Sequence, residues 1–155
     1  ALCIFVKPYW VNKVAKALVD KKRYRDIALY NYVYKVTFDE QFSAVTMKLP
    51  NGITYVGFEG TDHNLVGWEE DAALCYKYPV PADLDSIKYA KNNIDLFDKK
   101  VILLGHSKGG HLAMNAAAFS PWYIRMKVDK VYNLDGPGFR LREINSKLYK
   151  KMDIF

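Results

Sequence analysis

Apolar residues recur along the chain at two spacings, and each spacing predicts a different kind of element. In residues 10–34 they return every three or four positions, which predicts a helical N-terminal segment, although the tyrosine-rich stretch Asn31–Lys35 is ambiguous. The same spacing marks residues 66–76, which two prolines follow. It also marks Ala82–Phe97, where apolar residues share one face of the predicted helix: Leu84, Ile87, Ala90, Ile94 and Phe97.

Shorter runs of β-branched and aromatic residues predict strands. Ser43–Leu49 and Ile53–Phe58 flank Pro50-Asn51-Gly52, and Asn-Gly is typical of the turn in an antiparallel hairpin. Val101–Leu104 and Val128–Leu134 are continuous apolar runs. Such runs are expected of strands that are buried on both faces.

Helices are predicted after both of these later strands. Gly109–Phe119 is rich in small residues, and Arg140–Lys151 is also expected to be helical. Strands that alternate with helices predict an α/β fold whose sheet is mostly parallel after an antiparallel start. We expect a single domain over residues 1–155, with its core at about 40–140.

The composition shows that the chain can bury a core. Half of its 155 residues are hydrophobic and 26% are charged, which excludes a disordered chain. No apolar run approaches the ~20 residues of a membrane helix, and residues 1–6 are too short for a signal peptide. Cys3 and Cys75 form neither a zinc motif nor a disulfide framework, so we expect free thiols in a cytoplasmic protein. Because the first residue is not methionine, we expect the natural N-terminus to be missing.

The net charge of +6 comes largely from two basic clusters, Lys13–Arg25 and Arg140–Lys151. Such clusters bind nucleic acids or anionic membranes in some proteins. No nucleic-acid-binding motif accompanies them here. We therefore interpret both clusters as solvated helix faces and expect no nucleic-acid partner.

The junction between the strand Val101–Leu104 and the helix after it carries a serine between glycines. The sequence Gly105-His106-Ser107-Lys108-Gly109 matches G-x-S-x-G at the strand–helix boundary that this motif requires. Such a turn holds the serine hydroxyl clear of the sheet, and the glycines let the strand and the helix run close together. The helix N-terminus also favours negative charge there. We predict that Ser107 is a nucleophile; the alternative is a tight turn that happens to carry a serine.

Three motifs in order are similar to the class 3 lipase-like branch of the α/β-hydrolase superfamily. They are VGFEGTD at 56–62, GWEEDAAL at 67–74, and GHSKGG at 105–110, the strand-to-helix turn around Ser107 that we call the elbow. The lysine after the serine and the sequence DGPGF at 135–139 resemble an uncharacterised bacterial family within that branch. The resemblance covers residues 40–140. It implies an α/β-hydrolase-like fold and a serine esterase or lipase, of which this chain would be a C-terminally truncated form.

A serine esterase also needs an oxyanion hole, in which two N–H groups hold the charged intermediate. The first donor is expected from the residue after the nucleophile, Lys108. The resemblance implies Thr61 as the second, in the loop after Ile53–Phe58; the alternative is a plain polar turn. We expect Trp68 and Asp71 to brace this loop.

The acid that orients the catalytic base has one main candidate. Asp135 follows the strand Val128–Leu134, and it comes after the serine, as expected. In the lipase-like branch, however, the acid usually follows a later strand. Asp135 is therefore either the triad acid or a turn residue before Gly136. Asp153 is a weaker candidate.

None of the three histidines comes after the acid, where the base is expected. We expect His106 to be a packed spacer inside the elbow and His111 to hydrogen-bond near the helix start. His63, close to Thr61, is the remaining candidate base. We expect the catalytic histidine beyond Phe155.

The leading hypothesis is a serine hydrolase whose substrate is a small-molecule ester or a lipid. The alternative is a non-catalytic α/β-hydrolase-like domain that binds a ligand or partner and lacks a complete triad. Nothing in the sequence points to a metal or an organic cofactor. An apolar edge where a later strand belongs would favour self-association.

Overall fold

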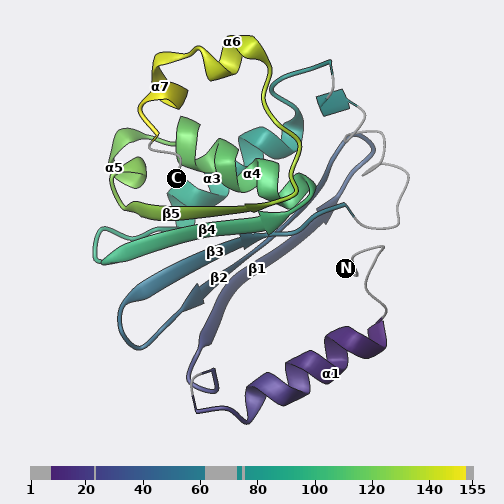
Figure 1. Ribbon diagram of the computed structural model, residues 1–155, viewed down its shortest axis with the longest axis vertical. Coiled ribbons are helices and arrows are strands. Elements are labelled where there is room, and N and C mark those ends of the chain that lie inside the picture. Colours follow the sequence, from purple (N-terminus) through teal and green to yellow (C-terminus); the bar gives the residue numbers. More distant parts are fainter. Residues whose placement is uncertain (1–7, 23, 62–72, 75, 153–155) are drawn as a thin grey trace.

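A five-stranded sheet forms the centre of the molecule (Figure 1). The computed structural model describes residues 8–22, 24–61, 73–74 and 76–152. The strands lie in the order β1-β2-β3-β4-β5. Their bounds are β1 (Ala28–Val36), β2 (Gln41–Lys48), β3 (Ile53–Phe58), β4 (Lys100–His106) and β5 (Val128–Leu134). The pairs β1·β2 and β2·β3 are antiparallel, whereas β3·β4 and β4·β5 are parallel.

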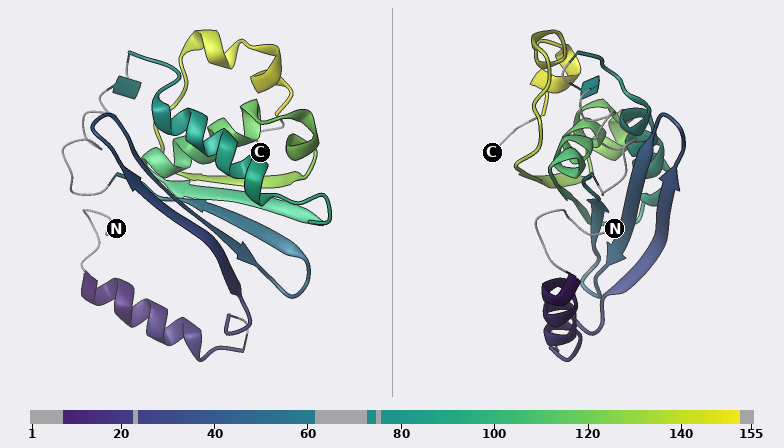
Figure 2. Two further views of the ribbon diagram at one scale, coloured as in Figure 1. Left: turned by 180° about the vertical axis from the view of Figure 1, so that it is seen from behind. Right: turned by 90° about the vertical axis from the view of Figure 1, so that its right-hand side faces the viewer.

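Helices α3 to α7 gather on one face of this sheet, and α1 stands apart from them (Figure 2). The longer helices are α1 (Pro8–Val19), α3 (Pro81–Asn93) and α4 (Lys108–Phe119). The short ones are α5 (Trp122–Arg125), α6 (Leu141–Ile144) and α7 (Lys147–Lys150). A parallel sheet core with flanking helices confirms the predicted α/β fold class.

The predicted hairpin is confirmed as β2 and β3. Gly52 in its turn has φ +83°, in the left-handed region that glycine adopts without a steric cost. Lys48 pairs with Thr54 next to this turn. The local Asn-Gly signal therefore set the register of these two strands.

The core lies between the sheet and the helices α3 and α4. Three rings from β2, β3 and α3, those of Phe42, Phe58 and Tyr89, have centroids 6.1 to 6.2 Å apart. Residues of β3, β4 and α4 with 0% exposure complete this layer: Val56, Val101, Leu103, Leu112, Ala113 and Ala116. Removal of these apolar side chains from water stabilises the described fold.

The predicted helix over residues 10–34 is wrong in its second half. Helix α1 ends at Val19, and Ala28–Val36 is strand β1. The tyrosines alternate in this stretch, and tyrosine favours strands. The strand pairs along most of its length with β2, with a register shift between Tyr30 and Val33. Pairing with the next strand along the chain, β2, thus decided what the local spacing left ambiguous.

The predicted apolar face of Ala82–Phe97 is confirmed for Ala90 and Ile94, which are buried, and wrong for Leu84 and Phe97. Leu84 is 56% exposed, and Phe97 is 95% exposed and lies beyond the helix end at Asn93. The buried face of α3 is instead mixed in polarity: Ala82, Asp83, Ser86, Tyr89 and Ala90. Polar side chains lie on it because they hydrogen-bond to α4 and β2 across the helix interface.

Three further predictions differ in detail. Strand β5 was expected to be buried on both faces, but most of its residues are exposed. It is the last strand of the sheet, and the helices α3 to α7 cover one face of the sheet. The segment Arg140–Lys151 forms two one-turn helices rather than one. Most of the predicted helix 66–76 lies outside the described residues.

Candidate active site

Ser107 occupies the turn between β4 and α4 in a strained backbone conformation. Its φ of 55° and ψ of −130° lie in a region that L-residues rarely adopt. The conformation costs about 1–3 kcal/mol, and it persists only where the surroundings enforce it. Here the Ser107 N–H donates to the carbonyl of Leu134 on β5 at 2.9 Å, and the Ser107 carbonyl accepts from Gly110 at 2.9 Å.

The flanking glycines are required by close backbone contact. A Cβ atom on Gly105 would lie 2.2 Å from the carbonyl carbon of Gly109. A Cβ on Gly109 would lie 2.2 Å from the carbonyl oxygen of Phe58 on β3. No side chain fits at either position, so helix α4 begins directly against β3 and β4.

The loop after β3 lies beside Ser107. Because β3 and β4 are parallel, with Phe58 opposite Gly105, both strands end at the same edge of the sheet. A Cβ on Gly60 would lie 3.5 Å from Ser107 Cβ and 2.8 Å from the carbonyl oxygen of His106. Thr61 follows Gly60 and is half-buried. The segment of Thr61 therefore lies on the expected side, while its part as an oxyanion donor stays a prediction.

Lys108 turns its side chain into the protein, where it is 1% exposed. Its Nζ donates to the backbone carbonyl of Gln41 at 2.8 Å and to the Gln41 side-chain Oε1 at 3.0 Å. The Gln41 side-chain amide donates to the carbonyl of Gly60 at 3.4 Å. A buried ammonium group needs such acceptors. Gln41 thus links the residue after Ser107 to the loop that precedes Thr61.

Asp135 also lies at this edge of the sheet. It follows β5 directly and has φ 57°, the left-handed conformation that suits a turn. In the next residue, a Cβ on Gly136 would lie 2.7 Å from the carbonyl oxygen of Ser107. The loop of Asp135 is therefore packed against the elbow. Whether Asp135 is the acid stays a prediction, and Asp153 lies outside the described residues.

The structure distinguishes the histidines. His106 is exposed. His111 is 2% exposed, its Nε2 lies 3.0 Å from Oδ1 of Asp83, and its Nδ1 lies 3.0 Å from the carbonyl oxygen of Pro137. Both ring nitrogens of His111 are thus engaged away from Ser107, as expected of a histidine that hydrogen-bonds near the helix start. His63 lies outside the described residues.

Sequence reasoning missed Gln41 and Asp83. Gln41 and Lys108 are 67 positions apart, and Asp83 and His111 are 28 positions apart. One signal could have pointed to a residue such as Gln41. Lys108 is the first residue of a helix of small residues that packs closely on the sheet. A lysine that is buried at such a position needs hydrogen-bond acceptors for its charge.

The sheet and helices define an α/β-hydrolase-like fold of the kind found in lipases. Two structures of the Rhizomucor miehei lipase propeptide complex, a native form and a deletion mutant, superpose with TM-scores of 0.51 at 18% identity. The superpositions cover 80% of this chain and 46% and 47% of those chains. A fungal lipase–inhibitor complex has a TM-score of 0.48 at 20% identity, over 68% of this chain and 47% of that one. The chain therefore spans less than half the length of these lipases.

The family itself is shown by the sequence as a whole. The model of the Mbeg1-like family matches residues 18–154, and the chain belongs to this family. A search of curated proteins gave no match. Among the described residues, no helix is both long and apolar enough to cross a membrane.

Proposed function

We propose that this chain carries the nucleophile of a lipase-like serine hydrolase that acts on carboxylic esters. The observation that carries the proposal is the backbone of Ser107, at φ 55° between β4 and α4. A serine held in a costly conformation at a sharp strand-to-helix turn is typical of a nucleophile elbow. The lipase-like fold around it supports the same class.

The proposed reaction is acyl transfer in two steps. The Ser107 hydroxyl attacks the ester carbonyl while a base takes its proton, and the tetrahedral oxyanion collapses with loss of the alcohol. Water then attacks the acyl-serine and releases the acid. The proposed oxyanion donors are the backbone N–H groups of Lys108 and Thr61. The N-terminus of α4 adds a partial positive charge on the same side.

This proposal takes the base from outside the described residues, because the buried histidine next to the elbow, His111, is already engaged. Both ring nitrogens of His111 are occupied. The candidates are His63 and a histidine beyond Phe155. Asp135 is the proposed acid, because it lies in a loop packed against the elbow.

A non-catalytic binding domain is the second candidate. The engagement of His111 with Asp83 and Pro137 favours it, since the buried histidine of the elbow helix serves structure rather than proton transfer. Such a domain would keep the elbow as a rigid turn and would bind its ligand without turnover.

Hydrolysis of p-nitrophenyl esters by the natural protein separates the two candidates. We expect turnover that Ser107→Ala abolishes while the fold is retained. Ser120→Ala is the matched control, because Ser120 lies at the other end of α4 and its buried hydroxyl has no hydrogen-bond partner among the described residues. Equal turnover by the wild type and Ser107→Ala would refute the proposal.

A further inference from the structure

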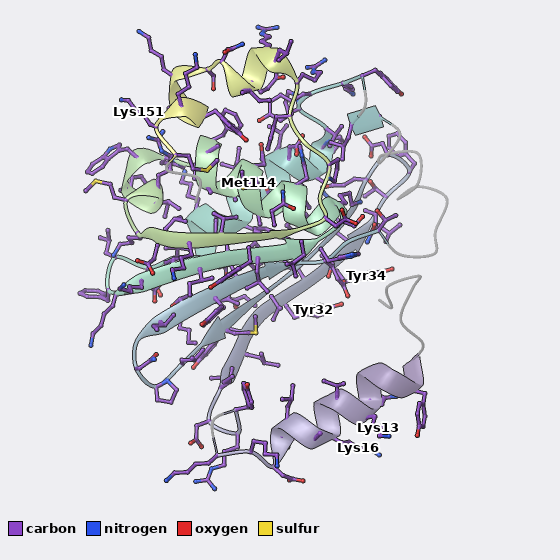
Figure 3. The ribbon with its side chains drawn as sticks, viewed as in Figure 1. Lys13, Lys16, Tyr32, Tyr34, Met114 and Lys151 are labelled. Carbon is purple, nitrogen blue, oxygen red and sulfur yellow. The ribbon has the colours of Figure 1, made fainter. Side chains whose placement is uncertain are left out.

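A buried polar pair lies behind the elbow, and the proposed reaction makes no use of it. Asp83 on α3 is 0% exposed, and His111 in the first turn of α4 is 2% exposed. Their contact joins α3 to α4. These two helices lie on the same face of the sheet (Figure 3). Burial of an ionisable group lowers the stability of the fold unless its polar atoms find hydrogen-bond or ion-pair partners. The presence of this pair in the interior therefore needs an explanation beyond packing.

The hydrogen bonds fix where the protons lie. The carbonyl oxygen of Pro137 can only accept, so the Nδ1 of His111 carries a proton and donates to it at 3.0 Å. The 3.0 Å contact between His111 Nε2 and Asp83 Oδ1 then needs a second proton. The pair is therefore either an imidazolium with a carboxylate or an imidazole with a carboxylic acid.

Asp83 is itself held from two sides. Its Oδ2 accepts from the N–H of Val80 at 2.9 Å, at the start of α3. Its backbone carbonyl accepts from the side-chain amide of Asn115 at 2.8 Å. Asn115 is 0% exposed and lies one turn after His111 on α4. Asp83 thus offers one oxygen to His111 in a fixed direction.

On its other side, His111 holds the loop 135–139. Besides the bond to Pro137, its ring stacks on Phe139 with centroids 4.3 Å apart and planes at 28°. A Cβ on Gly136 would lie 2.7 Å from the backbone nitrogen of His111. Three residues of the loop therefore contact one histidine, and the same loop carries Asp135.

We infer that His111, held by Asp83, is a positioning residue that clamps the loop 135–139 against the elbow. Its effect on the reaction rests on the proposed function, because it acts through the placement of Asp135 beside Ser107. The clamp itself rests only on the contacts of His111. The two claims therefore need separate measurements.

The clamp is tested first in the unaltered natural protein. Nitrogen-15 NMR of the histidine rings is expected to show His111 with a proton on Nδ1 that exchanges slowly with water. An unprotonated Nδ1 would overturn the proposal. In His111→Phe, which keeps a ring on Phe139 but removes both hydrogen bonds, exchange of the Gly136 amide, which donates to Asn133 Oδ1 at 2.9 Å, should quicken at least ~10-fold relative to the strands. Unchanged exchange in a folded variant would also overturn it.

The effect on the serine is tested by the rate at which a fluorophosphonate probe labels Ser107. We expect His111→Phe to slow labelling of the folded protein by ~10- to 100-fold, since small displacements of a reacting group have costs of this size. Asp83→Asn should stay within about twofold of the wild type, because its amide can donate to Nε2 while its oxygen accepts from Val80. Equal rates for His111→Phe and wild type would overturn the positioning role. A wild type that is never labelled would refute the proposed function and leave the NMR result to decide the clamp.

Discussion

The Nζ of Lys108 lies 3.0 Å from the side-chain oxygen of Gln41, so the residue after the elbow serine is fastened to the first residue of β2. The same glutamine donates to the carbonyl of Gly60. The two backbone segments proposed as oxyanion donors are thus held by one side chain. Hydrogen bonds to Gln41 therefore hold these two segments at a fixed distance, although they are far apart in the sequence.

Removal of the Lys108 ammonium group should therefore cost stability. We expect Lys108→Met to lower the free energy of unfolding by about 1–3 kcal/mol, because the buried Gln41 oxygens lose a charged donor. Urea unfolding measures the effect. Lys88→Met, at an exposed position of α3, is the control and should stay within about 0.5 kcal/mol of the wild type. Equal midpoints for the two variants would contradict the account.

Gly109 should tolerate no side chain. In Gly109→Ala the new methyl group would lie 2.2 Å from the Phe58 carbonyl oxygen, which forces β3 and α4 apart. Overpacking of this kind costs about 1–3 kcal/mol or more, and we expect a large drop in melting temperature or insoluble protein. Gly138→Ala is the matched control, since a Cβ there meets nothing within 4 Å. A Gly109→Ala protein as stable as Gly138→Ala would show that the elbow is looser than described.

The strained backbone of Ser107 predicts that a residue which relieves the strain will stabilise the fold, even though it removes the proposed nucleophile. Ser107→Gly removes the clash that an L-residue suffers at φ 55°, and the serine side chain makes no capping hydrogen bond to α4. We expect Ser107→Gly to be more stable than Ser107→Ala by about 1–3 kcal/mol, since a strained backbone conformation of this kind costs L-residues that amount. Denaturant unfolding of both variants decides the point. Greater stability of the alanine variant would mean that the turn is not strained.

Buried tyrosines predict a loss of stability at alkaline pH. Burial raises the pKa of Tyr89, which donates to the carbonyl of Asn31 at 2.8 Å. Above about pH 10 the unfolded chain loses this proton while the folded protein keeps it, so the free energy of unfolding falls as the pH rises. Unfolding by urea at pH 8, 9.5 and 11 should show this fall, and Tyr89→Phe should make it shallower. The exposed Tyr76→Phe serves as control. An identical slope in wild type and Tyr89→Phe would contradict the assignment.

The parts of the fold with strong local signals were predictable from the sequence. The hairpin follows from Asn51-Gly52, and the elbow follows from glycines that flank one serine between a strand and a helix. β1 was missed, because the helical spacing of residues 10–18 was extended over the alternating tyrosines, which instead form a strand that pairs with β2. The polar residues on the buried face of α3 were missed for a similar reason.

Only those residues of the candidate site that are consecutive in the sequence were predictable. Ser107 and its neighbours are consecutive, so one motif names them. Gln41 and Asp83 reach the site from separate elements, and their polar side chains carry no periodic signal that announces a buried partner. Three-dimensional packing is needed to see that His111 is held by Asp83 rather than free to act as a base.

The central claim is that Ser107 is an activated nucleophile, and the mass of the natural protein after treatment with a fluorophosphonate probe tests it most directly. We predict a single covalent adduct that peptide mapping places on Ser107 and that is absent in Ser107→Ala. A folded wild-type protein with no adduct, or an adduct that persists in Ser107→Ala, would contradict the claim.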